Sequence, residues 1–233
     1  MDLSYIDILK FVLGTIGFAI VGPIVGCLLA GIDRKLSAKM QGRVGPPLLQ
    51  PFYDVRKLFG KEKASVNKAE GAYVGTALFF AFCAGGVFFT GGNILMCVFI
   101  ITLSSLMFIV AAFCTRSPFA EIGASRECIQ VMSYEPMILF MAITYYMVTG
   151  NFNVSAVFGI QIPVVAPGIL VFLGLLFVLT IKLRKSPFDI SMSHHAHQEI
   201  VRGVTTEMSG STLGLVEIMH WCETVLFLGW VGM

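Results

Sequence analysis

The sequence contains little charge for its length. Only 13% of its 233 residues are Asp, Glu, Lys or Arg, whereas 56% are hydrophobic, and the formal net charge is +2. Soluble globular domains carry about twice that share of charged residues, so the composition excludes an ordinary soluble domain and indicates an integral membrane protein. A net charge this small also gives no reason to expect a nucleic acid partner.

Motifs that hold redox cofactors are also missing. The cysteines form no C-x-x-C pair, and no G-x-G-x-x-G fingerprint follows a strand. A chain that carried electrons itself would need cluster ligands or a nucleotide-binding loop. We therefore expect this chain to bind no cofactor and no metal. The six cysteines are interpreted as small buried hydrophobic residues: Cys27, Cys83, Cys97, Cys114, Cys128 and Cys222.

Long uncharged segments make up most of the chain. About 20 residues in a helix cross a hydrocarbon core of roughly 30 Å, and residues 11–32 suffice for one such helix. The runs 71–115 and 136–181 each suffice for two, divided by turn residues. The fold class predicted is an all-α integral membrane protein with about six transmembrane helices. They are expected in a single domain, 1–233, near residues 5–32, 71–91, 94–115, 131–149, 166–183 and 213–231.

The positions of lysine and arginine predict the orientation. Nine of the sixteen lie between Arg34 and Lys68, and six more follow the third and fifth predicted helices. The loops near 91–93 and 150–165 carry none. Because basic residues concentrate in short cytoplasmic loops, we expect the basic loops in the cytoplasm and both termini of this six-span arrangement outside a cell (inner) membrane.

A short amphipathic helix is predicted between the first two spans, at 51–61. It follows the helix-breaking sequence Gly45-Pro46-Pro47 and has an apolar face opposite a charged one. Two interpretations stay open, a lipid-facing anchor and a docking surface for a soluble partner. The apolar face consists of Phe52, Val55, Leu58 and Phe59, and the charged face of Asp54, Arg56, Lys57 and Lys61.

Acidic residues occur inside or next to the apolar runs, where an unpaired charge is costly. Glu217, His220 and Glu223 follow one another at i, i+3 spacing, so they share one helix face. Carboxylates and imidazoles held this closely are typical of proton relays, although pairing with a basic residue or an amide is the structural alternative. The other acids of this kind are Glu121, Glu127, Glu135 and Glu207.

Three histidines lie close together at 194–197. His194, His195 and His197, with Glu199 nearby, resemble a metal site, but no second Cys/His pair completes one. Imidazoles titrate near neutral pH, so a proton relay or sensor at the mouth of an acidic path is the functional interpretation. Zinc binding and plain loop hydrogen bonding stay open.

Three stretches together resemble one membrane-protein family. The first contains Asp33-Arg34-Lys35 and the run from Gln41 to Glu62, and the second contains Gly123, Arg126, Gln130 and Ser133-Tyr134-Glu135. The third begins at Ser186-Pro187-Phe188-Asp189 and extends through Glu199, Val201, Gly203 and Glu207 to Glu217. They resemble the NuoH/ND1-like membrane subunits of complex I and of group 4 membrane-bound nickel–iron hydrogenases.

Two departures from quinone-reducing members favour the hydrogenase branch. Gly45-Pro46-Pro47 stands where those members usually have G-P-N, and the histidine segment stands where they have closely spaced acids. Both patterns are similar to the energy-converting (Ech-type) and CO-induced hydrogenases. Family members commonly have about two further helices after the sixth, so a short form or a missing C-terminal segment is expected.

The resemblance implies a subunit without a catalytic centre that joins a soluble redox arm to an ion-translocating membrane arm. The implied partners are hydrogenase large and small subunits carrying nickel–iron and iron–sulfur centres, an iron–sulfur ferredoxin-like subunit, antiporter-like membrane subunits and the lipid bilayer. Arg34, Arg43, Phe59 and Arg126 are the expected docking residues for the redox arm. The expected ion path consists of Glu127, Glu135, Asp189, Glu199, Glu207, Glu217, His220 and Glu223.

Two other functions stay open. The chain could be a quinone-site subunit of a complex I-like dehydrogenase, or an independent ion transporter. The transporter is disfavoured because no inverted repeat relates the two halves of the sequence. Carboxylates can conduct H⁺ or Na⁺, so the sequence favours neither ion, and it does not identify the electron donor and acceptor.

Overall fold

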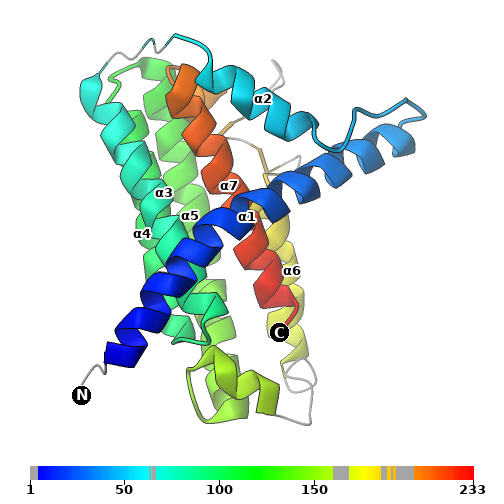
Figure 1. The fold of residues 1–233 in the computed structure, drawn as a ribbon, viewed down its shortest axis with the longest axis vertical. Helices are drawn as coiled ribbons and strands as arrows, with labels where there is room; N and C mark the ends of the chain where they lie inside the picture. Colours follow the sequence, from blue (N-terminus) through cyan, green and yellow to red (C-terminus); the bar gives the residue numbers. More distant parts are fainter. Residues whose placement is uncertain are drawn as a thin grey trace.

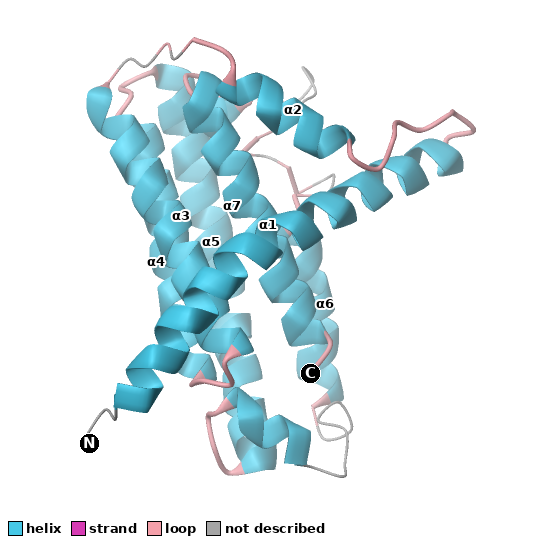
Figure 2. Cartoon of the chain, viewed as in Figure 1, coloured by secondary structure: helices cyan, strands magenta, loops and turns pink. Residues whose placement is uncertain are grey.

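The computed structural model describes residues 5–62, 64, 67–159, 168–184, 188–189, 191–192 and 202–233. These residues form helices joined by turns, with one isolated β-bridge, so the predicted all-α class is confirmed (Figures 1 and 2). The elements are α1 (Tyr5–Met40), α2 (Gln50–Phe59), α3 (Lys68–Phe89), α4 (Ile94–Phe113), α5 (Pro118–Thr149), η1 (Val154–Gly159), α6 (Ile169–Lys182), η3 (Gly203–Thr205) and α7 (Gly210–Val231).

Helix α1 continues beyond the predicted end at residue 32. Its 36 residues extend through Asp33, Arg34 and Lys35 to Met40, a length of about 54 Å that exceeds a hydrocarbon core. Hydropathy detects only the apolar part of such a helix, which explains the difference. In Figure 1, α1 runs obliquely across α3 and α7.

Helices α3 and α4 form the predicted hairpin. Asn67 and Asn93 cap their N-termini by accepting hydrogen bonds from the amides of Ala69 and Leu95. The hairpin turn lies beside the loop after α5, because the amide of Ile94 donates to the carbonyl of Phe152 at 2.8 Å. The two loops without Lys or Arg therefore meet at one end of the molecule.

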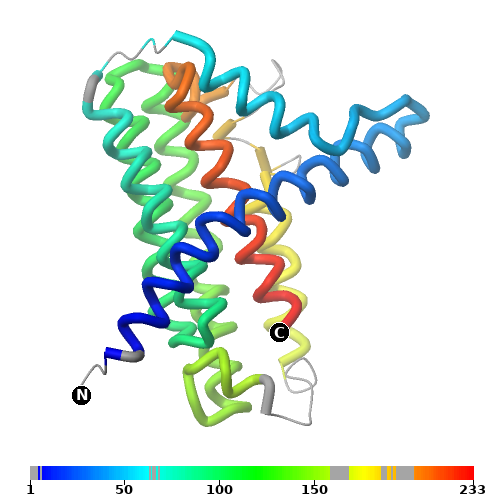
Figure 3. The backbone as a smooth tube through the Cα atoms, in the orientation of Figure 1, coloured from blue at the N-terminus to red at the C-terminus, as the bar shows by residue number. Residues whose placement is uncertain are grey.

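Helix α5 begins well before the predicted start at residue 131. Pro118 begins it, since proline lacks the amide that the first turn does not use, and Gly150 ends it in the left-handed region at φ 69°. The early start places Glu127 inside the helix. The tube in Figure 3 shows α5 running the length of the bundle behind α3 and α7.

Among the described residues, five helices are long and apolar enough to cross a membrane: α1, α3, α4, α5 and α7. Helix α6, expected as a sixth span at 166–183, comprises 14 residues of the described chain, about 21 Å. Six spans is therefore only an approximate description. The segments that carry most of the lysines and arginines lie at the end where α2 lies, away from the 91–93 turn (Figure 1).

Helix α2 packs on the rest of the chain. Val55 is buried against Cys27 of α1 and Trp221 of α7, whereas Phe52, Tyr53 and Phe59 stay largely exposed. The predicted amphipathic helix at 51–61 is thus present at Gln50–Phe59. Of its predicted apolar face, Val55 is turned to the protein and Phe52 is not.

Small residues allow the helices to approach closely. A Cβ on Gly86 would lie 2.8 Å from the Cα of Thr15, so α1 and α3 meet backbone to backbone.

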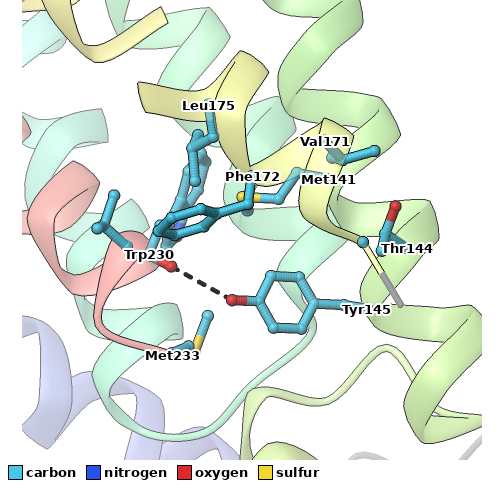
Figure 4. Close-up of a pocket in the computed structure, with 10 residues that line it drawn as sticks. Met141, Thr144, Tyr145, Val171, Phe172, Leu175, Trp230 and Met233 are labelled. Atoms are coloured by element: carbon cyan, nitrogen blue, oxygen red, sulfur yellow. Dashed lines mark hydrogen bonds between the residues drawn. The ribbon is translucent and has the colours of Figure 1, made fainter. Parts of the chain in front are cut away.

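At the end opposite α2, helices α5, α6 and α7 enclose a small apolar cavity of about 30 Å³, where the hydroxyl of Tyr145 donates to the carbonyl of Trp230 at 3.2 Å (Figure 4). The ionisable groups lie elsewhere.

Candidate functional site

A buried lysine forms one part of the candidate site. Lys182 ends α6, and its ammonium lies 3.2 Å from an oxygen of Glu223 on α7. Both side chains are less than a tenth exposed. The same ammonium donates to the hydroxyls of Ser105 on α4 and Tyr134 on α5, each at 3.1 Å. Buried charges need such partners, because desolvation of an unpaired ion is costly.

Arg184, two residues after Lys182, contacts a second buried acid of the site. Arg184 pairs with Glu127 of α5 at 2.7 Å and contacts Nε2 of His220 on α7 at 2.9 Å. A guanidinium can only donate, so Nε2 of His220 is an acceptor and Nδ1 carries the proton in the neutral ring. That Nδ1 lies 3.4 Å from Glu223. The imidazole therefore links the two ion pairs.

The carboxylate of Glu127 is also held from the loop that follows α6. Ser191 donates from its hydroxyl to Glu127 and lies 3.2 Å from the side-chain oxygen of Gln130. Gln130 in turn donates to the carbonyl of Phe188 at 2.6 Å. Close packing supports this region, because a Cβ on Gly123 would lie 2.4 Å from the backbone of Gly203.

These contacts form a continuous series of polar groups. It runs from Glu127 through Arg184, His220 and Glu223 to Lys182 and involves three helices and the segment after α6. Two acids and two bases balance in charge when the imidazole is neutral. Phe108 of α4 packs against the series: its ring is T-shaped to the imidazole of His220, and the guanidinium of Arg184 lies over its ring, 5.5 Å from the centre.

A cavity of about 410 Å³ adjoins the series. Lys182, Arg184, His220 and Glu223 line one side, and further ionisable side chains come from α1, α7 and the segment after α6. A cavity this large and polar can hold several waters. The additional ionisable residues are Asp33, Arg34, Asp189 and Glu217.

The structure thus brings together part of the predicted ion path. Glu127, His220 and Glu223 belong to the contact series, and Asp189 and Glu217 line the adjoining cavity. Glu135 and Glu207 are half-buried and line neither. Glu199 and the histidines His194, His195 and His197 lie outside the described residues, so their predicted roles stay predictions.

The predicted docking residues are spread over the same end of the molecule. Arg34 pairs with Asp54 of α2 at 2.7 Å, and Arg43 is exposed and donates to Gln41. Phe59 is about half exposed at the end of α2, and Arg126 is partly buried in α5. Their contacts identify no partner, and docking stays a prediction.

The sequence analysis did not predict Lys182 and Arg184 as site residues. They form the ion pairs with Glu223 and Glu127. They directly follow a 46-residue uncharged run and were counted only as loop charges. Their position at the end of such a run was the available signal. Ser191, and Glu70 buried at the start of α3, were also not selected. Among the described residues, no group of His, Cys, Asp or Glu has the arrangement of a metal site.

The sequence of this chain matches one known family. Residues 13–232 match the family described as NADH dehydrogenase, and the chain belongs to that family. The resemblance to NuoH/ND1-like membrane subunits is thereby confirmed. This membrane-embedded chain also has the fold of a chain in the structure of "the membrane-bound sulfane sulfur reductase (MBS), an archaeal respiratory membrane complex". The TM-score is 0.83 over 95% of this chain and 78% of that chain, at 24% identity.

Curated relatives come from both branches of the family. Hydrogenase-4 component C and formate hydrogenlyase subunit 4, both of Escherichia coli (strain K12), are 27% and 29% identical over 82% and 84% of this chain. A subunit of the NADH-quinone oxidoreductase of Dehalococcoides mccartyi (strain CBDB1) is 28% identical over 98% of this chain and 71% of its own length. The chain spans 64% and 67% of the two hydrogenase relatives.

Proposed function

We propose that this chain is the membrane subunit of an ion-translocating, ferredoxin-linked nickel–iron hydrogenase complex of the energy-converting type. In this role it binds no cofactor. It joins the soluble redox arm, which carries the metal centres, to the antiporter-like membrane arm. Its own chemistry is ion movement along buried ionisable side chains, driven by electron transfer in the partner subunits.

The buried series from Glu127 to Lys182 is the observation on which this proposal rests. Structural ion pairs need two partners, whereas here five ionisable side chains are linked end to end beside a polar cavity. The imidazole of His220 is a titratable group between two charged pairs, and it can take up a proton on Nε2 when the hydrogen bond from Arg184 is released. The series therefore has the composition of a proton relay.

The relatives favour the hydrogenase branch. Two of the curated proteins that match are named as components of hydrogenase and formate hydrogenlyase. The segments Gly45-Pro46-Pro47 and 193–198 depart from the pattern of quinone-reducing members, and both are similar to the hydrogenase members. A ferredoxin-like donor subunit and the Ech type follow from this resemblance and belong to the proposal.

The basic end of the molecule is proposed to face the cytoplasm and the redox arm. Arg34, Arg43, Phe59 and Arg126 lie there and are exposed or partly exposed, as a docking surface requires. Impermeant maleimide labelling of Asn151→Cys from outside intact cells tests the orientation, with Lys57→Cys protected. Labelling of Lys57→Cys from outside, with Asn151→Cys protected, would show the opposite orientation.

The ion path is tested by Glu223→Gln in the purified complex, reconstituted into vesicles. The variant should keep hydrogen production with an artificial electron donor and lose at least tenfold in ferredoxin-driven ion uptake, because only coupling passes through Glu223. Glu121→Gln is the matched control, since Glu121 is an exposed acid of the same membrane domain. Unchanged ion uptake in Glu223→Gln would refute the path.

A quinone-site subunit is the second candidate. It is favoured by the match to the NADH-quinone oxidoreductase of Dehalococcoides mccartyi, which covers 98% of this chain. Purification of the native complex distinguishes the two candidate functions. A nickel-containing subunit would support the hydrogenase, and a bound quinone would support the dehydrogenase. A chain that purifies alone would support an independent transporter.

A further inference from the structure

A second large cavity lies under α2, apart from the buried charge series. It measures about 500 Å³ and is bounded by α1, α2, α7 and the segment just before α7. Helix α2 forms one side of it and packs against α7 at two places, where Val55 meets Trp221 and where the ring of Phe59 lies over Gly214. The cavity therefore lies at the basic end of the molecule, where the apolar spans begin.

Basic side chains dominate the rim of this cavity. Lys57, Lys61 and Arg202 line it, and none of the three makes an ion pair within the described part of the chain. Asp54 also lines it, but its carboxylate already accepts from Arg34 at 2.7 Å and from Gln50 at 2.9 Å. With Arg34 and Glu217 included, four bases face two acids, so the cavity favours an anion.

Apolar side chains also line the cavity and form its wall. Pro51, Val55, Leu58 and Leu213 line it together with the indole of Trp221. An inorganic anion would leave this surface in contact with water, whereas an acyl chain would cover it. The cavity thus combines an anion-binding rim with an apolar wall, as an anionic amphiphile requires.

We propose that this cavity binds the phosphate headgroup of an anionic phospholipid, with Lys57, Lys61 and Arg202 as its ligands and the α2–α7 wall against its acyl chain. The lipid would add a contact between α2 and the bundle to the direct packing of Val55 and Phe59. Arg34 and Glu217 line both this cavity and the one beside the buried series, but the three proposed ligands belong to neither the series nor the proposed ion path, so variants of these ligands test the lipid site separately.

The test compares two double variants in the purified, delipidated complex. Lys57→Gln with Lys61→Gln removes two bases from the rim, and Lys35→Gln with Lys39→Gln removes two exposed bases outside it. Each basic side chain near an anionic lipid is worth about fivefold in affinity. Fluorescent phosphatidylglycerol should therefore bind about 25-fold more weakly to the first variant and nearly normally to the second.

Arg202→Gln, on a different element, should weaken binding about fivefold and guards against a local folding defect in α2. Three results would overturn the site. They are equal losses in both double variants, equal binding of phosphatidylcholine, and displacement of the labelled lipid by millimolar inorganic phosphate. The last would identify a free oxyanion as the ligand.

Discussion

Lys182 and Glu223 form an ion pair in which the ammonium and the carboxylate are 3.2 Å apart and both side chains are less than a tenth exposed. The pair joins α6 to α7, and the remaining donors of the ammonium reach α4 and α5. One buried cation therefore joins four helices through polar contacts.

The first prediction concerns this pair. Lys182→Met should destabilise the protein by about 3–5 kcal/mol, because it leaves the charge of Glu223 buried without its partner. Lys182→Met with Glu223→Met should recover most of that loss, since no uncompensated ion remains. Thermal unfolding of the purified complex measures both. A double variant as unstable as the single one would show that the charges themselves are needed for folding.

The second prediction concerns the contact of α1 with α3. Gly86→Ala should destabilise this contact by about 1–3 kcal/mol, because the added Cβ would lie 2.8 Å from the Cα of Thr15. Gly75→Ala in the same helix is the control, since nothing lies within 4 Å of its Cβ position. Equal melting temperatures for both variants would mean that α1 shifts freely against α3.

The sequence predicted the helices better than their ends. Residues 5–32 were expected as a helix because hydropathy detects its apolar part, but the charged continuation to Met40 has no hydropathy signal. The early start of α5 at Pro118 has no hydropathy signal either, because its first turns carry Glu121, Arg126 and Glu127. Helix α6 is shorter than a span within the described residues.

The site was partly predictable for a similar reason. His220 and Glu223 are neighbours on one helix, so their i, i+3 spacing predicts their contact. The contacts of Lys182 with Glu223 and of Arg184 with Glu127 join residues 41 and 57 positions apart. Only tertiary packing creates such pairs, and no local pattern encodes them.

The third prediction concerns pH and the attachment of α2. Burial alone would raise the pKa of Asp54, but the hydrogen bonds from Arg34 and Gln50 and the charges of Arg34 and Lys57 lower that pKa below its ordinary value. Such a group stabilises the folded state above the unfolded pKa of about 3.9, and the contribution is lost as pH falls through the lower folded value.

Protection of α2 from hydrogen exchange should accordingly be constant near neutral pH and fall below about pH 4. Asp54→Asn should lose at most about 1 kcal/mol at pH 7, because the pair is partly exposed. Glu62→Gln, an exposed acid beside α2, is the control. Identical exchange in Asp54→Asn and the parent protein would show that packing alone, at Val55 and Phe59, holds α2.

The fourth prediction concerns Arg184, whose guanidinium contacts Glu127 and His220 at once. A lysine retains the charge but has a single donor group, so Arg184→Lys cannot hold both partners in this geometry. The Nε2 atom of His220 would then lose its donor and become free to accept a proton. Ion uptake should fall about tenfold, with its pH profile displaced, while hydrogen production with an artificial donor persists.

The exposed Arg116 provides the matched control, and Arg116→Lys should leave uptake and its pH profile unchanged. Arg184→Gln separates charge from geometry, because it removes the cation and leaves Glu127 buried without its partner. If only Arg184→Gln impairs uptake and Arg184→Lys behaves like the parent, a positive charge suffices. The link from Arg184 to His220 would then play no part in ion movement.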